Sequence, residues 1–458
     1  MNPDKSFHIK RFIFFSILFI IYALVSFHRN CTTIVVEEMA ESWHCKTADL
    51  ASFGSIFFYS YGIMQIFAGL LCDVMEPAYL IGVAQFTCGI GSLLIGFAKG
   101  KTVGIIGRLL VGFGCGPVYV PVCRCIANWF DLKWLSTMVG ILVVIGGLGG
   151  LTATRPLELL SEKIGWRNCF YLFGGLSCGF SVLCALVVRG SPTSLGYKNI
   201  NSEMNESKEP ETLKKKFIQL KENSIIILKN RGYYLVTLYA ILDHGPYYVA
   251  ATYWGKPMLR HIFHFTEVEA SNILVSCSIG LISSAIVLPF VSDHIHSRKW
   301  VLCFAGFSAA AVHLWGFLVG HNLKPWMLYF IYVVIGFSTF PTTAICFPLL
   351  REYYHPSVTG SAIGMSNFVN FVMTGIYEEY TSAIIKHYGE SSPNVYTEKG
   401  YKMGFWLPGL IYLILSFIDA LILRDSEFIK KGRKNNNQIN DPIISYTEDG
   451  MQSIDSGK

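Results

Sequence analysis

Long apolar runs separated by short polar breaks cover most of the chain, with six runs before a polar stretch and six after it. A run of about 20 apolar residues is long enough for an α-helix to cross a bilayer. The pattern therefore predicts membrane helices at about residues 11–37, 48–72, 78–98, 102–128, 134–157 and 168–188, and then at about 231–254, 268–292, 298–319, 325–350, 357–385 and 403–423.

These helices predict an all-α polytopic membrane protein with 12 transmembrane helices in two six-helix halves. The N-terminal half is expected at residues 1–189 and the C-terminal half at 231–424. The central loop, residues 190–230, is polar, and its "TLKKKFIQLKENSIIIL" predicts either an amphipathic helix on the membrane surface or a solvated linker helix. The polar, Asn-rich tail at 425–458 is expected to be disordered.

Composition agrees with a membrane protein. Apolar and aromatic residues make up 52% of the chain and charged residues only 15%, whereas soluble proteins average about 25% charged. The balance excludes an ordinary soluble enzyme, a disordered chain and a nucleic-acid-binding module. The net charge of +6 has a topological explanation, because membrane proteins gather Lys and Arg in their cytoplasmic loops.

The positions of the basic residues predict the orientation in the membrane. With the N-terminus in the cytosol, 23 of the 37 Lys and Arg residues face the cytosol and 11 face the other side. Arg29, Arg108 and Arg155 fall within predicted helices. The positive-inside rule therefore places both termini and the central loop in the cytosol.

An internal repeat relates the two halves. Gly112 and Gly336 are 224 residues apart, and Gly140 and Gly364 share that offset. The aromatic pair at 129–130 matches the pair at 353–354 in the same register. Paired helical repeats in a membrane are the architecture of secondary transporters, in which the substrate site lies between the halves near the midplane.

Short motifs at matching places in the helix pattern resemble the major facilitator superfamily over nearly the whole chain. They read "GLLCD" after the second helix, "PFVSDHIHSRK" after the eighth, "RLLVGFG" in the fourth and "GWRNCF" at the start of the sixth. The first motif keeps Gly69 and Asp73 but lacks the family's basic residues. The Gly-Pro pair of drug/proton antiporters is missing from the fifth helix, which argues against a drug exporter.

The resemblance implies a secondary transporter that works by alternating access. It implies gating roles for Asp73 and Asp293 at cytosolic helix ends, together with Arg298 and Arg108. The segments "YWGKPML" and "GSAIGMSNFVN" are similar to a branch that includes organic-anion permeases and lysosomal dipeptide carriers.

Four polar residues are expected at one depth in the membrane. Asp243 lies 12 residues beyond Arg231, which is about 18 Å along a helix. Counting in the same way from the cytosolic ends of their helices brings three more residues to a similar level, namely Tyr61, Tyr119 and Asn367. Together with Arg29 they form the predicted substrate-binding set.

The two charges in this set indicate the chemistry. An ionisable residue at this depth needs a partner or a water-filled cavity, and the Arg29 fork suits a carboxylate or phosphate. We therefore expect a small polar substrate, either an organic anion, an amino acid or a dipeptide, and proton coupling through Asp243. A structural ion pair remains the alternative for both residues, as it does for Arg155, Glu378 and Glu379.

The sequence leaves alternative functions open and allows expectations about cofactors, partners and cellular location. A facilitative uniporter and a ligand sensor on the transporter fold remain open, whereas the lack of nucleotide-binding, nucleophile and zinc motifs argues against an enzyme. No cofactor or metal is expected. The expected partners are a small-molecule substrate, the lipid bilayer and protons, but not nucleic acid. The chain is expected to be a monomer in the plasma membrane or in a lysosomal or endosomal membrane.

Overall fold

The computed structural model describes residues 3–197, 213–339, 345–392 and 394–425. The first group of helices comprises α1 (Pro3–Asn30), α2 (Thr32–Ser42), η1 (Thr47–Leu50), α3 (Ala51–Val74), α4 (Pro77–Phe97), α5 (Lys101–Cys115), α6 (Tyr119–Trp129), α7 (Leu132–Thr152), α8 (Arg155–Ile164) and α9 (Trp166–Val187). A short helix η2 (Pro192–Leu195) and a longer helix α10 (Leu213–Leu228) follow this group.

The second group comprises α11 (Arg231–Tyr248), η4 (Val249–Tyr253), α12 (Gly255–Phe263), α13 (Glu267–His294), α14 (Lys299–Val319), η5 (Gly320–Asn322), α15 (Pro325–Thr339), α16 (Phe347–Tyr353), α17 (Pro356–His387), α18 (Glu398–Tyr401), η7 (Lys402–Trp406) and α19 (Leu407–Ile422). Between α17 and α18, strands β1 (Glu390–Ser392) and β2 (Val395–Tyr396) form an antiparallel hairpin in which Glu390 pairs with Tyr396.

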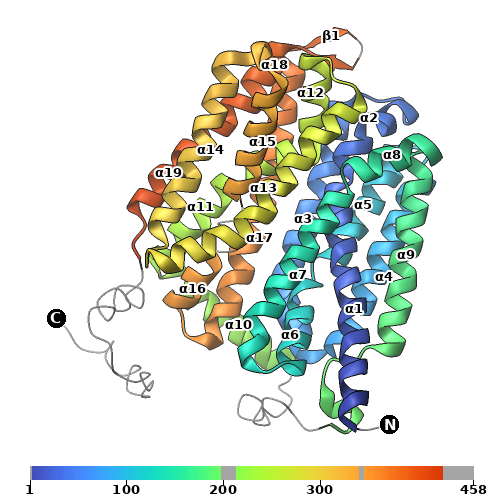
Figure 1. The fold of residues 1–458 in the computed structure, drawn as a ribbon, viewed down its shortest axis with the longest axis vertical. Helices are drawn as coiled ribbons and strands as arrows, with labels where there is room; N and C mark the ends of the chain where they lie inside the picture. Colours follow the sequence, from blue (N-terminus) through green and yellow to red (C-terminus); the bar gives the residue numbers. More distant parts are fainter. Residues whose placement is uncertain (1–2, 198–212, 340–344, 393, 426–458) are drawn as a thin grey trace, which may run out of the picture.

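The long helices run roughly along one direction (Figure 1). The first group, from blue to green, lies beside the second, from green to red. We call the end that carries α2, α8, α12 and α18 the upper end and the end that carries the N-terminus the lower end. On the predicted topology the lower end faces the cytosol.

Each of the 12 predicted helices coincides with one helix or with two consecutive ones, and the breaks have local causes. Gly116 and Pro117 separate α5 from α6, and Pro156 lies in the first turn of α8. Pro246 interrupts the hydrogen-bond ladder of α11, and the next turn, η4, is π-helical. Proline lacks the amide hydrogen that the helical hydrogen-bond ladder uses, so these breaks lie at or next to a proline, although α13 accommodates Pro289 within one helix.

Nine helices in the described part of the chain are long and apolar enough to cross a membrane, or up to ten if a bent pair counts as one span. The bent pair joins α10 to α11 at 90°. The apolar helix α15 ends just before residues 340–344, which lie outside the described residues. Residues 198–212 of the predicted polar linker and nearly all of the predicted disordered tail also lie outside them.

The repeat-related glycines lie at equivalent helix contacts in the two groups. Gly112 on α5 packs directly against the backbone of α3 at Phe57, and a Cβ there would be 2.7 Å from the Phe57 carbonyl oxygen. Gly336 on α15 lies against the carbonyl of Cys277 on α13, again with no room for a Cβ. The two glycines therefore perform the same packing role in the two halves.

The buried core shows which end of the molecule is closed. One hydrophobic cluster extends from the first group into the upper part of the second, where it includes Trp254, Leu274 and Tyr377. The lower part of the second group has a separate cluster around Tyr239, Leu302 and Leu349. The two groups therefore share one continuous core at the upper end, which describes a state closed on that side.

Candidate functional site

Arg29, near the C-terminal end of α1, lies between the two groups. Its guanidinium donates hydrogen bonds to the hydroxyls of Tyr61 on α3, at 3.1 Å, and Tyr248 on α11, at 3.4 Å. The guanidinium also lies 5.0 Å from the centre of the Tyr61 ring, within cation–π range. Among the described residues no carboxylate forms an ion pair with Arg29, and its Nε has no hydrogen-bond partner. The side chain therefore retains donors for an anion.

Arg108 on α5 holds the backbone of the residues that carry this site. Its guanidinium donates to the carbonyl oxygens of His28, at 2.6 Å, and Arg29, at 3.2 Å, next to the junction of α1 and α2. The side chain is buried, and the guanidinium lies 4.4 Å from the ring centre of Phe57. The structure thus places the predicted gating residue Arg108 where it holds the helix end that presents Arg29.

Aromatic rings surround the Arg29 side chain. The ring centre of Phe371 on α17 lies 4.6 Å from that of Tyr61 and 6.2 Å from that of His244. On the N-terminal side, the rings of Tyr22 and Tyr119 are 5.7 Å apart. The predicted residue Tyr119 therefore belongs to the aromatic shell next to Arg29, one ring further out than Tyr61.

Asp243 is buried among the helices of the second group. Tyr239 and Cys346 each lie within electrostatic range of both Asp243 and Asp419. Adjacent residues of an α-helix point about 100° apart. His244, the next residue, accordingly faces Tyr248, with ring centres 5.6 Å apart. The sequence singled out Asp243 on this helix but did not identify His244, which is the α11 residue that faces the aromatic shell.

Asn367 joins the two groups. Its side-chain amide donates to Gln65 on α3 at 3.3 Å, and Gln65 in turn donates to the carbonyl of Gly116 at 3.0 Å. Gln65 lies one helical turn from Tyr61, so Asn367 borders the aromatic shell through this amide pair.

A buried lysine links the two groups at the upper end. Lys256 on α12 is only 1% exposed, and its Nζ lies 2.6 Å from Glu158 on α8 and 2.7 Å from the carbonyl oxygen of Ile34 on α2. The same nitrogen forms an ion pair with Glu267 on α13. Lys256 thus satisfies its three donors with two carboxylates and one carbonyl from both groups.

Further charges extend this contact. Arg260, one turn after Lys256, pairs with Glu37 on α2 and lies 2.7 Å from Glu267. Burial and the charge of Arg260 lower the pKa of His261 to about 4, so its 3.3 Å contact with Glu37 joins a neutral imidazole to a carboxylate near neutral pH. We call the residues Glu37, Glu158, Lys256, Arg260 and Glu267 the upper lock.

Arg155 forms another contact between the two helix groups at the upper end. Its guanidinium donates to the side chain of Asn272 on α13 at 2.8 Å and to the carbonyl of Val268 at 3.3 Å. The structure therefore places Arg155 in a contact between the groups near the upper lock and apart from the Arg29 site.

The remaining predicted gating residues lie at the lower end. Arg298 is 2.7 Å from Asp293 and 3.5 Å from Glu352, all within the second group. Asp73 lies in the last turn of α3, and its side chain is outside the described residues. Asp293 and Arg298 are thus brought together as a pair.

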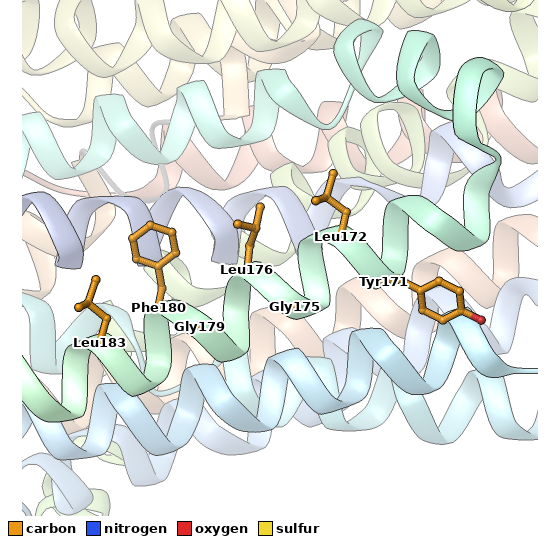
Figure 2. A pocket seen from close by; sticks show the side chains of 7 residues that line it. All are labelled: Tyr171, Leu172, Gly175, Leu176, Gly179, Phe180 and Leu183. Atoms are coloured by element: carbon orange, nitrogen blue, oxygen red, sulfur yellow. The ribbon is translucent and has the colours of Figure 1, made fainter.

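An apolar groove lies away from this site. It has a volume of about 420 Å³, runs along α9 and is lined by Tyr171, Leu172, Gly175, Leu176, Gly179, Phe180 and Leu183. Figure 2 shows the side chains of Leu172, Leu176 and Phe180 projecting from the same side of α9. An apolar groove on a membrane helix suits lipid chains and offers no charge to a polar substrate. In the described ranges, no three His, Cys, Asp or Glu residues are grouped to hold a metal ion.

The prediction from sequence missed the upper lock. Lys256 lies in the quoted segment "YWGKPML", where the topology count treated it as an outer-loop residue. One available signal was a lysine in a largely apolar stretch, with one acidic residue eleven positions away at Glu267 and others in the loops of the other half. The pairing itself required the tertiary structure.

Comparison with known proteins identifies the family. The Major Facilitator Superfamily profile matches residues 18–377. The chain is 22% identical over 372 residues to the "Probable hexose phosphate transport protein" of Chlamydia pneumoniae, covering 78% of this chain and 81% of that protein. It is 24% identical over 182 residues to the "Probable sulfoacetate transporter" of Cupriavidus necator, covering 40% and 42%. A "Membrane sensor protein" of Salmonella typhimurium is 21% identical over 364 residues, covering 75% and 78%.

Solved structures agree with this assignment. An inward-facing bacterial homologue of the lysosomal transporter Spinster superposes with a TM-score of 0.68 at 14% identity, covering 92% of this chain and 97% of that one. A D-xylose–proton symporter gives 0.67 at 14% identity, covering 89% and 97%. The predicted 12-helix, two-half membrane fold is confirmed, and the chain belongs to the Major Facilitator Superfamily.

Proposed function

We propose that this chain is a secondary transporter that moves a small organic anion across the membrane by alternating access. The observation that supports the proposal most directly is Arg29, a half-buried cation between the two groups that is hydrogen-bonded to two tyrosine hydroxyls and has no carboxylate partner in the described part of the chain. A buried charge without a counter-charge is costly, and a bound anion would supply one. The bidentate fork of Arg suits phosphate, sulfonate and carboxylate groups.

The names of the relatives favour the same class. A further relative, the "Cis,cis-muconate transport protein" of Acinetobacter baylyi, is 22% identical over 391 residues. Hexose phosphate, sulfoacetate and cis,cis-muconate differ in shape, but each is an organic anion. An amino acid or dipeptide is less favoured, because the described hydrogen bonds of Arg29 go to tyrosine hydroxyls and include no carboxylate that could bind an ammonium group beside it. The bacterial origin of these relatives favours the plasma membrane over a lysosomal or endosomal membrane.

The residues divide into three proposed roles. Arg29, Tyr61 and the shell that includes Tyr119 and Asn367 bind substrate. The upper lock and the Asp293–Arg298 pair act as gates at opposite ends. Asp243, an acid inside the second group, carries a coupling proton.

A ligand sensor on the same fold is the second candidate. It is favoured by the similarity to a membrane sensor protein over 75% of this chain. A sensor would bind the anion at Arg29 without moving it, so binding alone does not separate the two functions.

A thermal-shift screen of the purified protein tests the binding step. The panel contains glucose 6-phosphate, sulfoacetate, cis,cis-muconate and uncharged glucose. At a concentration 100 times its Kd, a ligand stabilises the folded state by about 2.7 kcal/mol. We expect at least one anion to raise the melting temperature and glucose to leave it unchanged.

The Arg29 variants make the screen specific. Arg29→Ala should weaken binding of the active anion by about 10- to 150-fold, the range for one or more charge-assisted hydrogen bonds. Arg29→Lys should restore only part of it, because an ammonium lacks the planar fork. Full affinity in Arg29→Ala would remove Arg29 from the binding site.

A further inference from the structure

Glu378 on α17 is buried in the contact between the two groups. Its side chain is 1% exposed, and neither carboxyl oxygen has a hydrogen-bond partner among the described residues. The carboxyl rests directly on α3 at Gly54, where a Cβ would overlap its Oε1 and touch the ring of Tyr253. The missing side chain at Gly54 therefore provides the space that Glu378 occupies.

The site lies above Arg29, toward the closed end. Glu378 is eight residues, or about 12 Å, from Lys386. Lys386 forms an ion pair with Asp49, next to the start of α3. α3 and α17 lie side by side, one from each group (Figure 1). When the two groups separate at the upper end, this stretch of the α3–α17 contact must open.

Four ionisable groups lie within electrostatic range of Glu378, three on neighbouring elements and one on α17 itself. They are Arg108 on α5, Tyr59 on α3, Tyr253 on η4 and its own neighbour Glu379. Arg108 is the only one of these four that carries a positive charge, and its guanidinium is directed to the carbonyls of His28 and Arg29.

Neither carboxyl oxygen of Glu378 accepts a hydrogen bond from Tyr59 in the described part of the chain, and the other two groups offer no donor either. Tyr253 donates its hydroxyl to the carbonyl of Thr47 at 2.6 Å. Glu379 accepts a hydrogen bond from Ser55 at 2.5 Å and adds negative charge next to Glu378. An ionised carboxylate in such a dry position is unfavourable, whereas the neutral acid is tolerated more easily.

We propose that Glu378 is a proton-binding site of the upper gate, which holds a proton while that end is closed and releases it to the solution on that side when the two groups separate. The inference rests on the alternating-access part of the proposed function. The proton enters from and returns to the same solution, so it is not carried across the membrane. Glu378 differs in this respect from Asp243.

The consequence is a conformational equilibrium that depends on pH. Closing the upper end takes up one proton, so lowering the pH favours the closed state. The ratio of closed to open molecules rises by up to about tenfold for each unit by which the pH is lowered. This holds in the pH range between the values at which Glu378 titrates in the open and the closed state. Above that range Glu378 is ionised in both states and the ratio becomes independent of its proton.

Pulsed EPR distance measurements on the full chain in nanodiscs test this proposal without any substrate. Spin labels are placed on unnatural side chains at Glu162 and Lys324, exposed positions at the upper end of the two groups, so that the 13 native cysteines are kept. A long distance between the two labels indicates an open upper end. In the wild type, the fraction of molecules with the long distance should decrease as the pH falls from 8.5 to 5.5. Glu378→Gln, which resembles the protonated acid, should remain at short distance throughout.

Glu379→Gln is the matched control, because it removes the neighbouring, exposed carboxylate and should keep the wild-type pH dependence. If Glu378→Gln keeps that dependence, or if the wild type shows none, the proposal is wrong. A pH response that disappears only in Glu378→Gln supports it even if no anion is found to be transported. Failure of the proposed function and failure of this inference are therefore distinguishable.

Discussion

Two cations between the helix groups, the buried Lys256 and the half-buried Arg29, have opposite surroundings. Lys256 contacts two carboxylates and a backbone carbonyl, so its charge is compensated within the protein. Arg29 contacts tyrosine hydroxyls and no carboxylate in the described part of the chain. A compensated cation can hold helices together, whereas an uncompensated one is suited to bind an anion. This difference assigns Lys256 to a gate and Arg29 to the substrate.

The single substitution Asp243→Asn should abolish uphill transport of the anion but leave its exchange across the membrane intact. The amide keeps the shape of the side chain but cannot release a proton, so exchange of the anion should continue while accumulation driven by a pH gradient is lost. Uptake into vesicles with and without an imposed pH gradient measures both. Undiminished accumulation in the variant would assign the proton elsewhere, and a wild type that ignores the gradient would mean facilitative transport.

Depth was predictable from the sequence at individual residues, but direction was not. A rise of about 1.5 Å per residue places Tyr61 and Asp243 at one level. It does not say which way each points. The exposed face of α11 carries Tyr234 and Leu238, which are aromatic and apolar, so no polar stripe indicates the orientation of this helix. His244 was missed for this reason.

The upper lock depends on short elements that the hydrophobic pattern does not show. α8 and α12 end near the upper surface and bring Glu158 and Lys256 together although they are 98 residues apart. Prolines and glycines marked several breaks in advance, such as Gly116–Pro117. The junction at Cys31 between α1 and α2 has no such residue and was predicted as continuous helix.

Lys256→Met should open the upper end. The substitution preserves length but leaves Glu158 buried without its cation, whereas Glu267 keeps its contact with Arg260. Removal of one partner of a buried ion pair costs about 3–5 kcal/mol. The long-distance population in the EPR measurement between positions 162 and 324 should increase at constant pH. Adding Glu158→Gln to Lys256→Met should recover part of the closed population, because it removes one uncompensated charge.

Lys46→Met provides the control for that variant. Lys46 also crosses between the groups, to Glu390, but its side chain is 53% exposed. An exposed ion pair contributes only about 0–1 kcal/mol, so the distance distribution should remain close to that of the wild type. Equal opening in the two variants would show that burial of the upper lock does not determine the closed state.

Over the whole molecule, the structure describes one of the two states that alternating access requires. A continuous hydrophobic core joins the groups at the upper end, while the lower part of the second group has a core of its own. Repeat-related glycines at equivalent contacts allow the two halves to be built alike. The twelve-helix pattern and the repeat were evident in the sequence, because length and hydropathy determine both. The closed end was not, because it depends on contacts between distant segments.

Counterflow in proteoliposomes tests whether the protein transports an anion that it binds at Arg29. Vesicles loaded with an unlabelled anion that binds in the thermal-shift screen are diluted into a trace of the labelled anion. We expect the labelled anion to accumulate transiently in vesicles with the wild-type protein. Labelled glucose, which is uncharged, should not accumulate, and Arg29→Ala should abolish accumulation of the anion. An anion that binds through Arg29 but shows no counterflow would contradict transport and identify a sensor. Counterflow that persists in Arg29→Ala would contradict the proposed substrate site.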